Sequence, residues 1–167
     1  KGDGSLTGYN VWKWIDYDNY NYPYAGAGSP DFSTNWIILR YAEIYLNDAE
    51  ARLETGDVEG ARKAVNMIRQ RVGLPDLTES DPEKLRELIR KERRIEFAFE
   101  EQRFYDVRRW KIGPETQTTL HGVRFVSPTE FKVTKTDIRT WNDRLYLTPV
   151  PHDEIVRSSV LKQNPGY

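Results

Sequence analysis

Two neighbouring stretches of the chain carry apolar residues at the spacing of an α-helix, and this constrains the fold more than any other feature. Between residues 36 and 72 the apolar positions recur every three or four residues, which places them on one face of each helix. They are Ile38, Ala42, Tyr45, Ala49 and Leu53 in the first stretch, and Val58, Ala61, Val65, Ile68 and Val72 in the second. We expect helices over residues 36–55 and 57–72 that pack antiparallel through these two faces.

The residues between and after these stretches favour the same arrangement. Gly56 is typical of the residue that follows a helix, and Asp57 is typical of the cap of the next one. Gly73 should end the second helix in the same way. The loop from Gly56 to Ala61 resembles the tight turn of tetratricopeptide units, in which small residues let two helices approach closely. The sequence therefore predicts an αα-hairpin.

A third helix is predicted to begin at Pro82, because Asp81 is a typical cap and proline suits the first helical position. We expect it to run to about Glu101, and a shorter helix over residues 103–110 should follow after a bend. The apolar side of the third helix is expected to consist of Leu85, Leu88, Ile89, Ile95 and Phe99.

The remainder of the chain predicts short extended elements. Alternating residues at 123–125 and 131–133 indicate short strands, and residues 145–147 should also be extended. The two prolines that follow prevent a regular helix until residues 153–156, where one turn is expected.

The predicted fold class is mainly α, with tetratricopeptide-like helix pairs, long loops and a few short strands. Residues 1–35 form an aromatic-rich loop segment in this interpretation, with a short strand at 11–15. Residues 36–111 form the helical core, and residues 112–167 form an irregular segment with short strands. The three parts are expected to make one domain.

The overall composition excludes several classes of function. The 167 residues carry a net charge of −1, without the basic excess of a typical nucleic-acid-binding protein. There is no cysteine, and His121 and His152 have no companion at the spacing of metal ligands. No phosphate loop, dinucleotide-binding fingerprint or nucleophile elbow is found. We expect no metal, no cofactor and no catalytic residue.

Three carboxylates, Glu92, Glu96 and Glu100, follow one another at a spacing of four residues and would share one helix face. A glycosidase needs two carboxyl groups that flank a sugar bond from opposite sides, which neighbours on one helix do not provide. Arginines lie close by in the sequence. We therefore expect a network of Arg–Glu ion pairs that joins helices.

Aromatic residues are dense between residues 9 and 24, where asparagine and aspartate alternate with them. Flat rings beside polar groups suit a sugar, because the rings contact its C–H face while the polar groups bond its hydroxyls. The candidate ligand-binding residues are Trp12, Trp14, Tyr17 and Tyr20. The alternative is that these rings anchor a loop onto the helices, as half-buried Tyr and Trp commonly do.

Several motifs together resemble the C-terminal region of the SusD/RagB family. They are Arg-Tyr-Ala-Glu at 40–43, Glu-Arg-Arg at 92–94, Arg-Arg-Trp at 108–110, Leu-Thr-Pro-Val-Pro at 147–151 and Gln-Asn-Pro-Gly-Tyr at 163–167. Two positions depart from the family pattern. Glu101 stands where many relatives have glycine, and Ser158-Ser159 replaces a common Asn-Pro.

This resemblance implies a non-enzymatic, lipid-anchored protein of the bacterial outer membrane that takes part in polysaccharide utilisation. Such proteins bind an oligosaccharide or another nutrient at the outer surface and deliver it to a SusC-like TonB-dependent transporter. The lipid anchor would lie outside this segment, in a longer protein. The alternative is a tetratricopeptide-like scaffold for protein–protein interaction.

Two further expectations concern surfaces. The first helices should expose an apolar surface on which other helices of a longer chain dock, because helical repeat units bury their faces against neighbours. The Pro-Val-Pro stretch and the terminal turn should tie the C-terminus back onto the helices.

Overall fold

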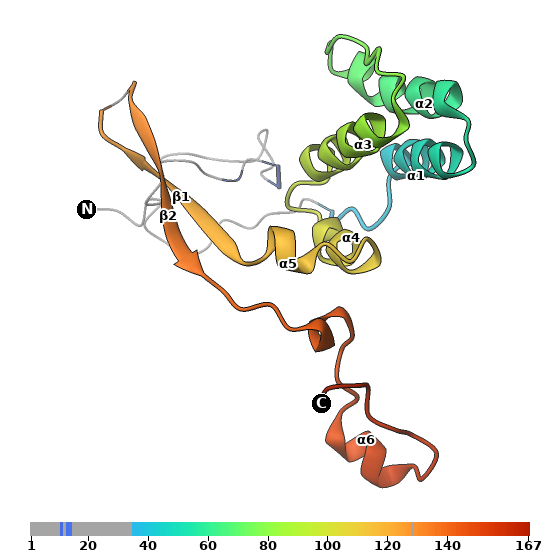
Figure 1. Cartoon of the computed structure of the whole chain (residues 1–167), viewed down its shortest axis with the longest axis vertical. Helices are drawn as coiled ribbons and strands as arrows, with labels where there is room; N and C mark the ends of the chain where they lie inside the picture. The colour runs from blue at the N-terminus through green and yellow to red at the C-terminus, as the bar shows by residue number, and fades with distance from the viewer. Residues whose placement is uncertain (1–10, 12, 15–34, 128) are drawn as a thin grey trace. The chain divides into compact units, whose positions relative to one another are not determined.

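The computed structural model describes residues 11, 13–14, 35–127 and 129–167. The chain divides into two compact units, residues 16–103 and residues 1–15 with 104–167, and each unit is described by itself. The described residues are mainly helical and include one pair of strands, so the predicted fold class is confirmed (Figure 1).

Three helices form the core of the first unit: α1 (Tyr41–Glu54), α2 (Val58–Arg71) and α3 (Pro82–Glu96). α1 and α2 form the predicted αα-hairpin, and α3 packs against both (Figure 1). Small and aliphatic side chains fill the space between the three helices. The most deeply buried are Leu46, Ala49, Ala61, Val65, Ile68, Leu85 and Ile89.

The predicted glycine and aspartate positions at helix ends are confirmed. Gly56 and Gly73 have φ angles of 87° and 71°, in the left-handed region that favours glycine. The Gly60 N–H donates to Asp57 Oδ1 at 2.8 Å, and the Lys84 N–H donates to Asp81 Oδ1 at 3.0 Å. These backbone hydrogen bonds hold the pKa of each aspartate below its usual value. Both side chains therefore act as helix caps.

The first helix begins later than the sequence predicted, at Tyr41 rather than residue 36. Arg40 is extended, with φ −145° and ψ 157°, and its side chain bonds to residues at the end of α3. These contacts hold the chain in a non-helical conformation before α1. Ile38, expected in the buried stripe, is 77% exposed, and Val72, just beyond the end of α2, is also exposed.

The third helix ends earlier than predicted, at Glu96 rather than about Glu101. Phe97 then turns into the core and is 3% exposed, while Ile95 and Phe99, both expected to be buried, are exposed. The predicted bend is present, because Phe99 and Glu101 adopt φ angles of 64° and 63°. Because the backbone is no longer helical after Glu96, the three-to-four-residue spacing of a helix does not predict which of the following residues are buried.

The second unit contains shorter elements. The boundary between the units falls within α4 (Gln102–Arg109), which is followed by α5 (Gly113–Thr116) and the antiparallel hairpin of β1 (Thr119–Phe125) and β2 (Phe131–Ile138). The two predicted strands are confirmed and are longer than expected. A 3₁₀ helix, η1 (Asp143–Tyr146), replaces most of the predicted extended segment at 145–147, because the Asn142 side chain caps it.

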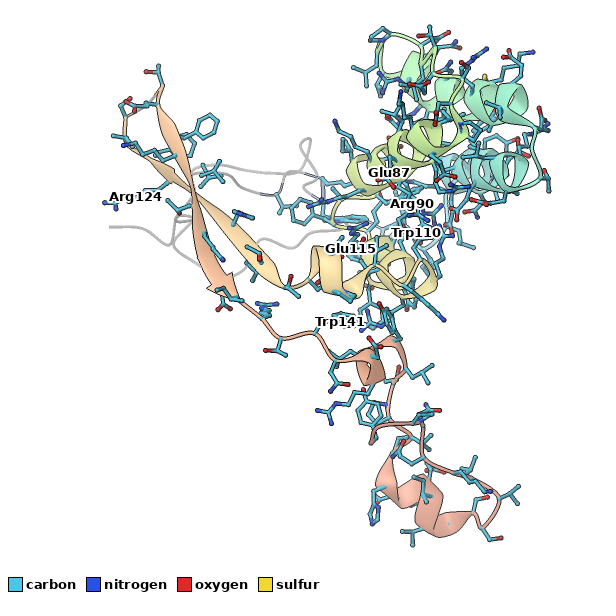
Figure 2. All side chains as sticks on the ribbon, viewed as in Figure 1. Glu87, Arg90, Trp110, Glu115, Arg124 and Trp141 are labelled. Atoms are coloured by element: carbon cyan, nitrogen blue, oxygen red, sulfur yellow. The ribbon has the colours of Figure 1, made fainter. Side chains whose placement is uncertain are left out.

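A tightly packed aromatic contact follows the hairpin. Trp141 lies beside α5 (Figure 2), so close to Gly113 that a Cβ there would lie 2.2 Å from its ring. Tyr146 packs against Trp141 with 5.0 Å between ring centroids, and its hydroxyl accepts a hydrogen bond from the Gly113 N–H. Only glycine fits position 113 in this arrangement.

The C-terminus is tied back onto an extended segment and not onto a helix as expected. Gln163 pairs with Val150 through hydrogen bonds of 2.8 and 2.9 Å. Asn164 donates to the Thr148 carbonyl, and the Tyr167 hydroxyl donates to the Leu147 carbonyl. The helix before it, α6 (His152–Arg157), includes the predicted turn. Leu147, Thr148 and Val150 lie outside regular secondary structure, so their carbonyl groups can accept these bonds.

We predict that Ala61→Leu lowers the free energy of unfolding by about 1–3 kcal/mol, because Ala61 is fully buried at the crossing of α1 and α2. Urea unfolding measures the change. Lys63→Leu adds a similar apolar side chain at an exposed position of the same helix and should change stability little. Equal stability of the two variants would show that the crossing is not close-packed.

We predict that Glu101→Gly makes the chain more stable than Glu101→Ala, by about 1 kcal/mol, because a side chain in the left-handed region is strained. Both variants remove the same exposed carboxylate, so the difference between their free energies of unfolding reports on the strain of the backbone at residue 101. Thermal and urea unfolding measure it. If the alanine variant is as stable as the glycine variant, residue 101 is not held at a positive φ in solution.

Candidate functional site

The candidate ligand-binding aromatics are largely outside the described residues. Trp12, Tyr17 and Tyr20 are not among them. Trp14 is half-buried and lies with Lys13 in a turn, so the strand expected at residues 11–15 is wrong at these positions. Alternation over so few residues does not distinguish a strand from a turn. The ligand-binding role of the four aromatics stays a prediction.

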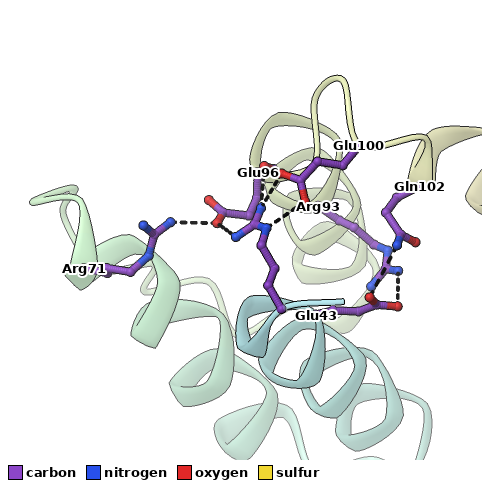
Figure 3. A network of polar contacts seen from close by, with 7 residues as sticks. Glu43, Arg71, Arg93, Glu96, Glu100 and Gln102 are labelled. Atoms are coloured by element: carbon purple, nitrogen blue, oxygen red, sulfur yellow. Dashed lines mark hydrogen bonds and ion pairs between the residues drawn. The ribbon is translucent and has the colours of Figure 1, made fainter. Parts of the chain in front are cut away.

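The row of glutamates, in contrast, is fully described and forms the predicted ion-pair network. Glu96 and Glu100 lie close together (Figure 3), and both carboxylates pair with the guanidinium of Arg40, which is 56 and 60 residues earlier in the sequence. Arg71 of α2 reaches Glu96 as well, at 2.6 Å. The network therefore joins the end of α3 to the start of α1 and the end of α2.

Arg40 bonds to several groups of this network at once. Its Nη1 donates to Glu96 Oε1 at 2.5 Å, its Nε donates to Glu100 Oε2 at 2.7 Å, and its Nη2 donates to the Glu96 carbonyl at 2.7 Å. Its guanidinium also lies 4.6 Å from the centroid of the Phe97 ring. Burial lowers the pKa of Arg40, but the bonds from the two carboxylates outweigh it and the pKa is raised. Arg40 is thus held in one conformation.

Two further pairs extend the network into the core. Arg69 of α2 donates to Glu92 Oε2 at 2.6 Å, and Glu92 is 7% exposed. Arg93, 3% exposed, donates to Asn47 Oδ1 at 2.7 Å and lies 3.8 Å from Glu43. Gln102 donates to Glu43 as well (Figure 3). All three core helices are therefore joined through buried or half-buried polar groups.

This arrangement is suited to stability and not to catalysis. Glu92, Glu96 and Glu100 each accept a hydrogen bond from an arginine, so each carboxylate is engaged within the network. The residues also lie on one side of α3 and its extension. They do not flank a space for a sugar bond.

Sequence reasoning missed the arginine just before α1 and two arginines of α2. Arg40, Arg69 and Arg71 lie 23 to 60 residues from their carboxylate partners. No local spacing links positions so far apart, so the row of glutamates indicated that a network exists but not which arginines complete it. Glu43 and Asn47 were likewise found only in the folded chain.

Residues 11, 13–14, 35–127 and 129–167 include no group of three histidines, aspartates or glutamates placed to hold a metal ion. None of the helices in the described part combines the length and apolar character that crossing a bilayer requires.

We predict that Arg69→Met lowers the free energy of unfolding by about 3–5 kcal/mol, because it leaves the Glu92 carboxylate buried without its partner. Arg86→Met is the matched control, since Arg86 pairs with glutamates that are mostly exposed. That variant should lose no more than about 1 kcal/mol. Similar losses in the two variants would contradict a buried ion pair. Chemical unfolding with a circular dichroism signal distinguishes these outcomes.

Comparison with known proteins gives a consistent result along the whole chain. The sequence model of the SusD family matches residues 1–167. SusD-like protein P2 of Formosa agariphila is 38% identical over 155 residues, covering 86% of this chain and 28% of that protein. SusD-like protein P25 of the same organism is 32% identical over 172 residues, covering 90% of this chain and 31% of that protein.

A crystal structure agrees with the sequence comparison. A SusD-like protein from Bacteroides fragilis is 96% identical, with a TM-score of 0.87, and the match covers 100% of this chain and 32% of that one. The chain thus spans about a third or less of the length of these relatives. The helix pair, the Glu-Arg-Arg helix and the C-terminal motifs all lie within the matched region. The chain belongs to the SusD family.

Proposed function

We propose that this chain is part of a cell-surface protein that binds an oligosaccharide or another nutrient and delivers it to a SusC-like TonB-dependent transporter. The match of the SusD family to all 167 residues is the observation that carries the proposal. The protein would sit on the outer face of the outer membrane through a lipid anchor located outside this segment. It would act in polysaccharide utilisation without nucleic acid as a partner.

A non-catalytic role is part of the proposal. The three carboxylates that a hydrolase could have used are each engaged by an arginine, and the side chains of all three are less than 12% exposed. A carboxylate held in an ion pair in this way has to leave its arginine before it can act on a sugar bond. Binding without turnover is consistent with this chemistry.

The aromatic residues Trp12, Trp14, Tyr17 and Tyr20 are the proposed sugar contacts within this chain. Neutral sugars offer C–H faces and hydroxyl groups but no charge, so stacking on aromatic rings suits them better than the Arg–Glu network does. The alternative function, a tetratricopeptide-like scaffold, has support only from the single helix pair of α1 and α2.

We expect oligosaccharides that bind this chain to change its tryptophan fluorescence, and Trp14→Ala to weaken that binding at least tenfold. Trp36→Ala is the control, because Trp36 is 55% exposed and lies outside the proposed contacts. Isothermal titration with the same sugars gives the affinity independently, and circular dichroism checks that each variant is folded. If Trp14→Ala unfolds the chain while no sugar changes the fluorescence, these rings serve packing and not binding.

The same titrations test the non-catalytic role. Incubation with each bound oligosaccharide should release no new reducing ends. Hydrolysis that disappears in a folded Glu96→Gln variant would contradict both this role and the proposed function of the network.

A further inference from the structure

The β1–β2 hairpin has one apolar face and one polar face. Val123 and Phe125 of β1 lie opposite Val133 and Phe131 of β2, and the alternation of a strand places all four side chains on one face. Apolar side chains are exposed there, as they are at the start of α1, where the sequence predicted an apolar surface. An apolar sheet face suits burial, so the polar face of the hairpin is the one that remains in water.

Two cations lie directly opposite each other on the polar face. Arg124 of β1 is in register with Lys132 of β2, and both residues are exposed. Figure 2 shows the Arg124 side chain directed away from the hairpin. Like charges at directly opposed positions of an antiparallel pair repel each other and destabilise the pairing. The hairpin therefore carries these two cations at a cost to its own stability.

The charges nearby do not neutralise this pair. Within the part of the chain that the structure describes, neither Arg124 nor Lys132 has an ion pair. Glu130 shares their face, two residues before Lys132, but it makes no ion pair with either cation. The other carboxylate of the hairpin, that of Asp137, pairs with Arg139 at 3.6 Å. An anion from outside the chain would supply the missing countercharge.

The number of cations indicates what kind of anion this is. An arginine binds a carboxylate or a sulfate through two parallel N–H donors, and a lysine adds a point charge. Nucleic acids and anionic membranes attract larger basic surfaces, with about four or more cations. Residues 119–138 hold only three lysines and arginines beside two acids. The pair therefore suits a single anionic group with neutral neighbours, which an acidic oligosaccharide provides.

The surface beside the two cations is low and polar. A Cβ at Gly122 would lie 2.6 Å from the methyl carbon of Thr136, so only a residue without a side chain lets Thr136 lie against the sheet there. The hydroxyl groups of Thr136 and Thr134 donate to the carbonyl groups of Leu120 and Gly122. Each hydroxyl oxygen still has a lone pair that can accept a hydrogen bond from a sugar.

We propose that Arg124 and Lys132 form a subsite for the acidic group of an oligosaccharide, either a uronic acid carboxylate or a sulfate ester. The neighbouring sugar ring would lie over Thr134 and Gly122. This inference rests on the proposed function and adds a substrate class to it, that of acidic oligosaccharides. Because the subsite is exposed, salt screens it, and it contributes to selectivity more than to total affinity.

Titration calorimetry with matched sugars tests this proposal. The acidic probes are a short oligogalacturonate and a sulfated galactan oligosaccharide. The neutral probe is the methyl ester of the same oligogalacturonate, which keeps the sugar backbone and loses the charge. Arg124→Gln and Lys132→Gln each remove one cation of the subsite. Lys135→Gln is the matched control, because it removes the same charge from the same strand on the opposite face.

We expect an acidic probe to bind about tenfold more tightly than the neutral ester at low salt, and this difference to shrink as the NaCl concentration rises. Arg124→Gln and Lys132→Gln should each weaken binding of the acidic probe about tenfold and leave binding of the ester unchanged. Lys135→Gln should change neither affinity. In urea unfolding, the two subsite variants should be at least as stable as the unsubstituted chain, because they relieve a repulsion.

Other results would overturn the proposal. Equal affinities for the acidic probes and the ester would exclude an anion subsite and leave the proposed function in place, whereas a lack of binding to any oligosaccharide would contradict both. An equal loss of affinity in Lys135→Gln and Lys132→Gln would show an effect of net charge alone. An oligonucleotide that binds more tightly than the acidic probes, and depends on Arg124 and Lys132, would identify a nucleic acid as the ligand.

Discussion

The structure of the helical unit depends on one guanidinium group, that of Arg40. It holds the segment before α1 extended, pairs with Glu96 and Glu100, and lies over the ring of Phe97, which fills the core where α3 has ended. Two half-buried carboxylates, one at the end of α3 and one just after it, would be costly without this partner, because ionised groups lose hydration on burial. The place where α1 begins and the place where α3 ends are therefore set by the same contact.

The polar network and the apolar core together determine how the three helices are positioned against one another. Close packing at Ala49 and Ala61 lets α1 and α2 approach, but contacts between small apolar residues resist sliding only weakly. The pair of Arg69 with Glu92 links α2 and α3, and Arg93 links α3 and α1 through Asn47. Each of these bonds has one geometry, so together they specify the register of the helices.

In the second unit, local contacts between neighbouring segments define the structure. The hairpin pairs Val123 with Val133 and Phe125 with Phe131, and Trp141 packs against the backbone of Gly113. The C-terminal Gln163 and Tyr167 bond to carbonyl groups of an extended segment that contains two prolines. These features correspond to motifs that the SusD family model covers, and they have an architectural role: they place backbone groups in hydrogen bonds where regular secondary structure is absent.

The sequence alone determined the elements whose causes are local. Glycine and aspartate at helix ends, apolar spacing in α2 and alternation in the hairpin depend on residues a few positions apart, so they could be predicted correctly. It also indicated that Glu92, Glu96 and Glu100 belong to an ion-pair network. Only the tertiary structure decided that Arg40, Arg69 and Arg71 complete it, that α1 begins at Tyr41, and that Phe97 is buried while Phe99 is exposed. These outcomes depend on groups brought together from up to 60 residues apart, and the periodicity of one helix carries no information about such contacts.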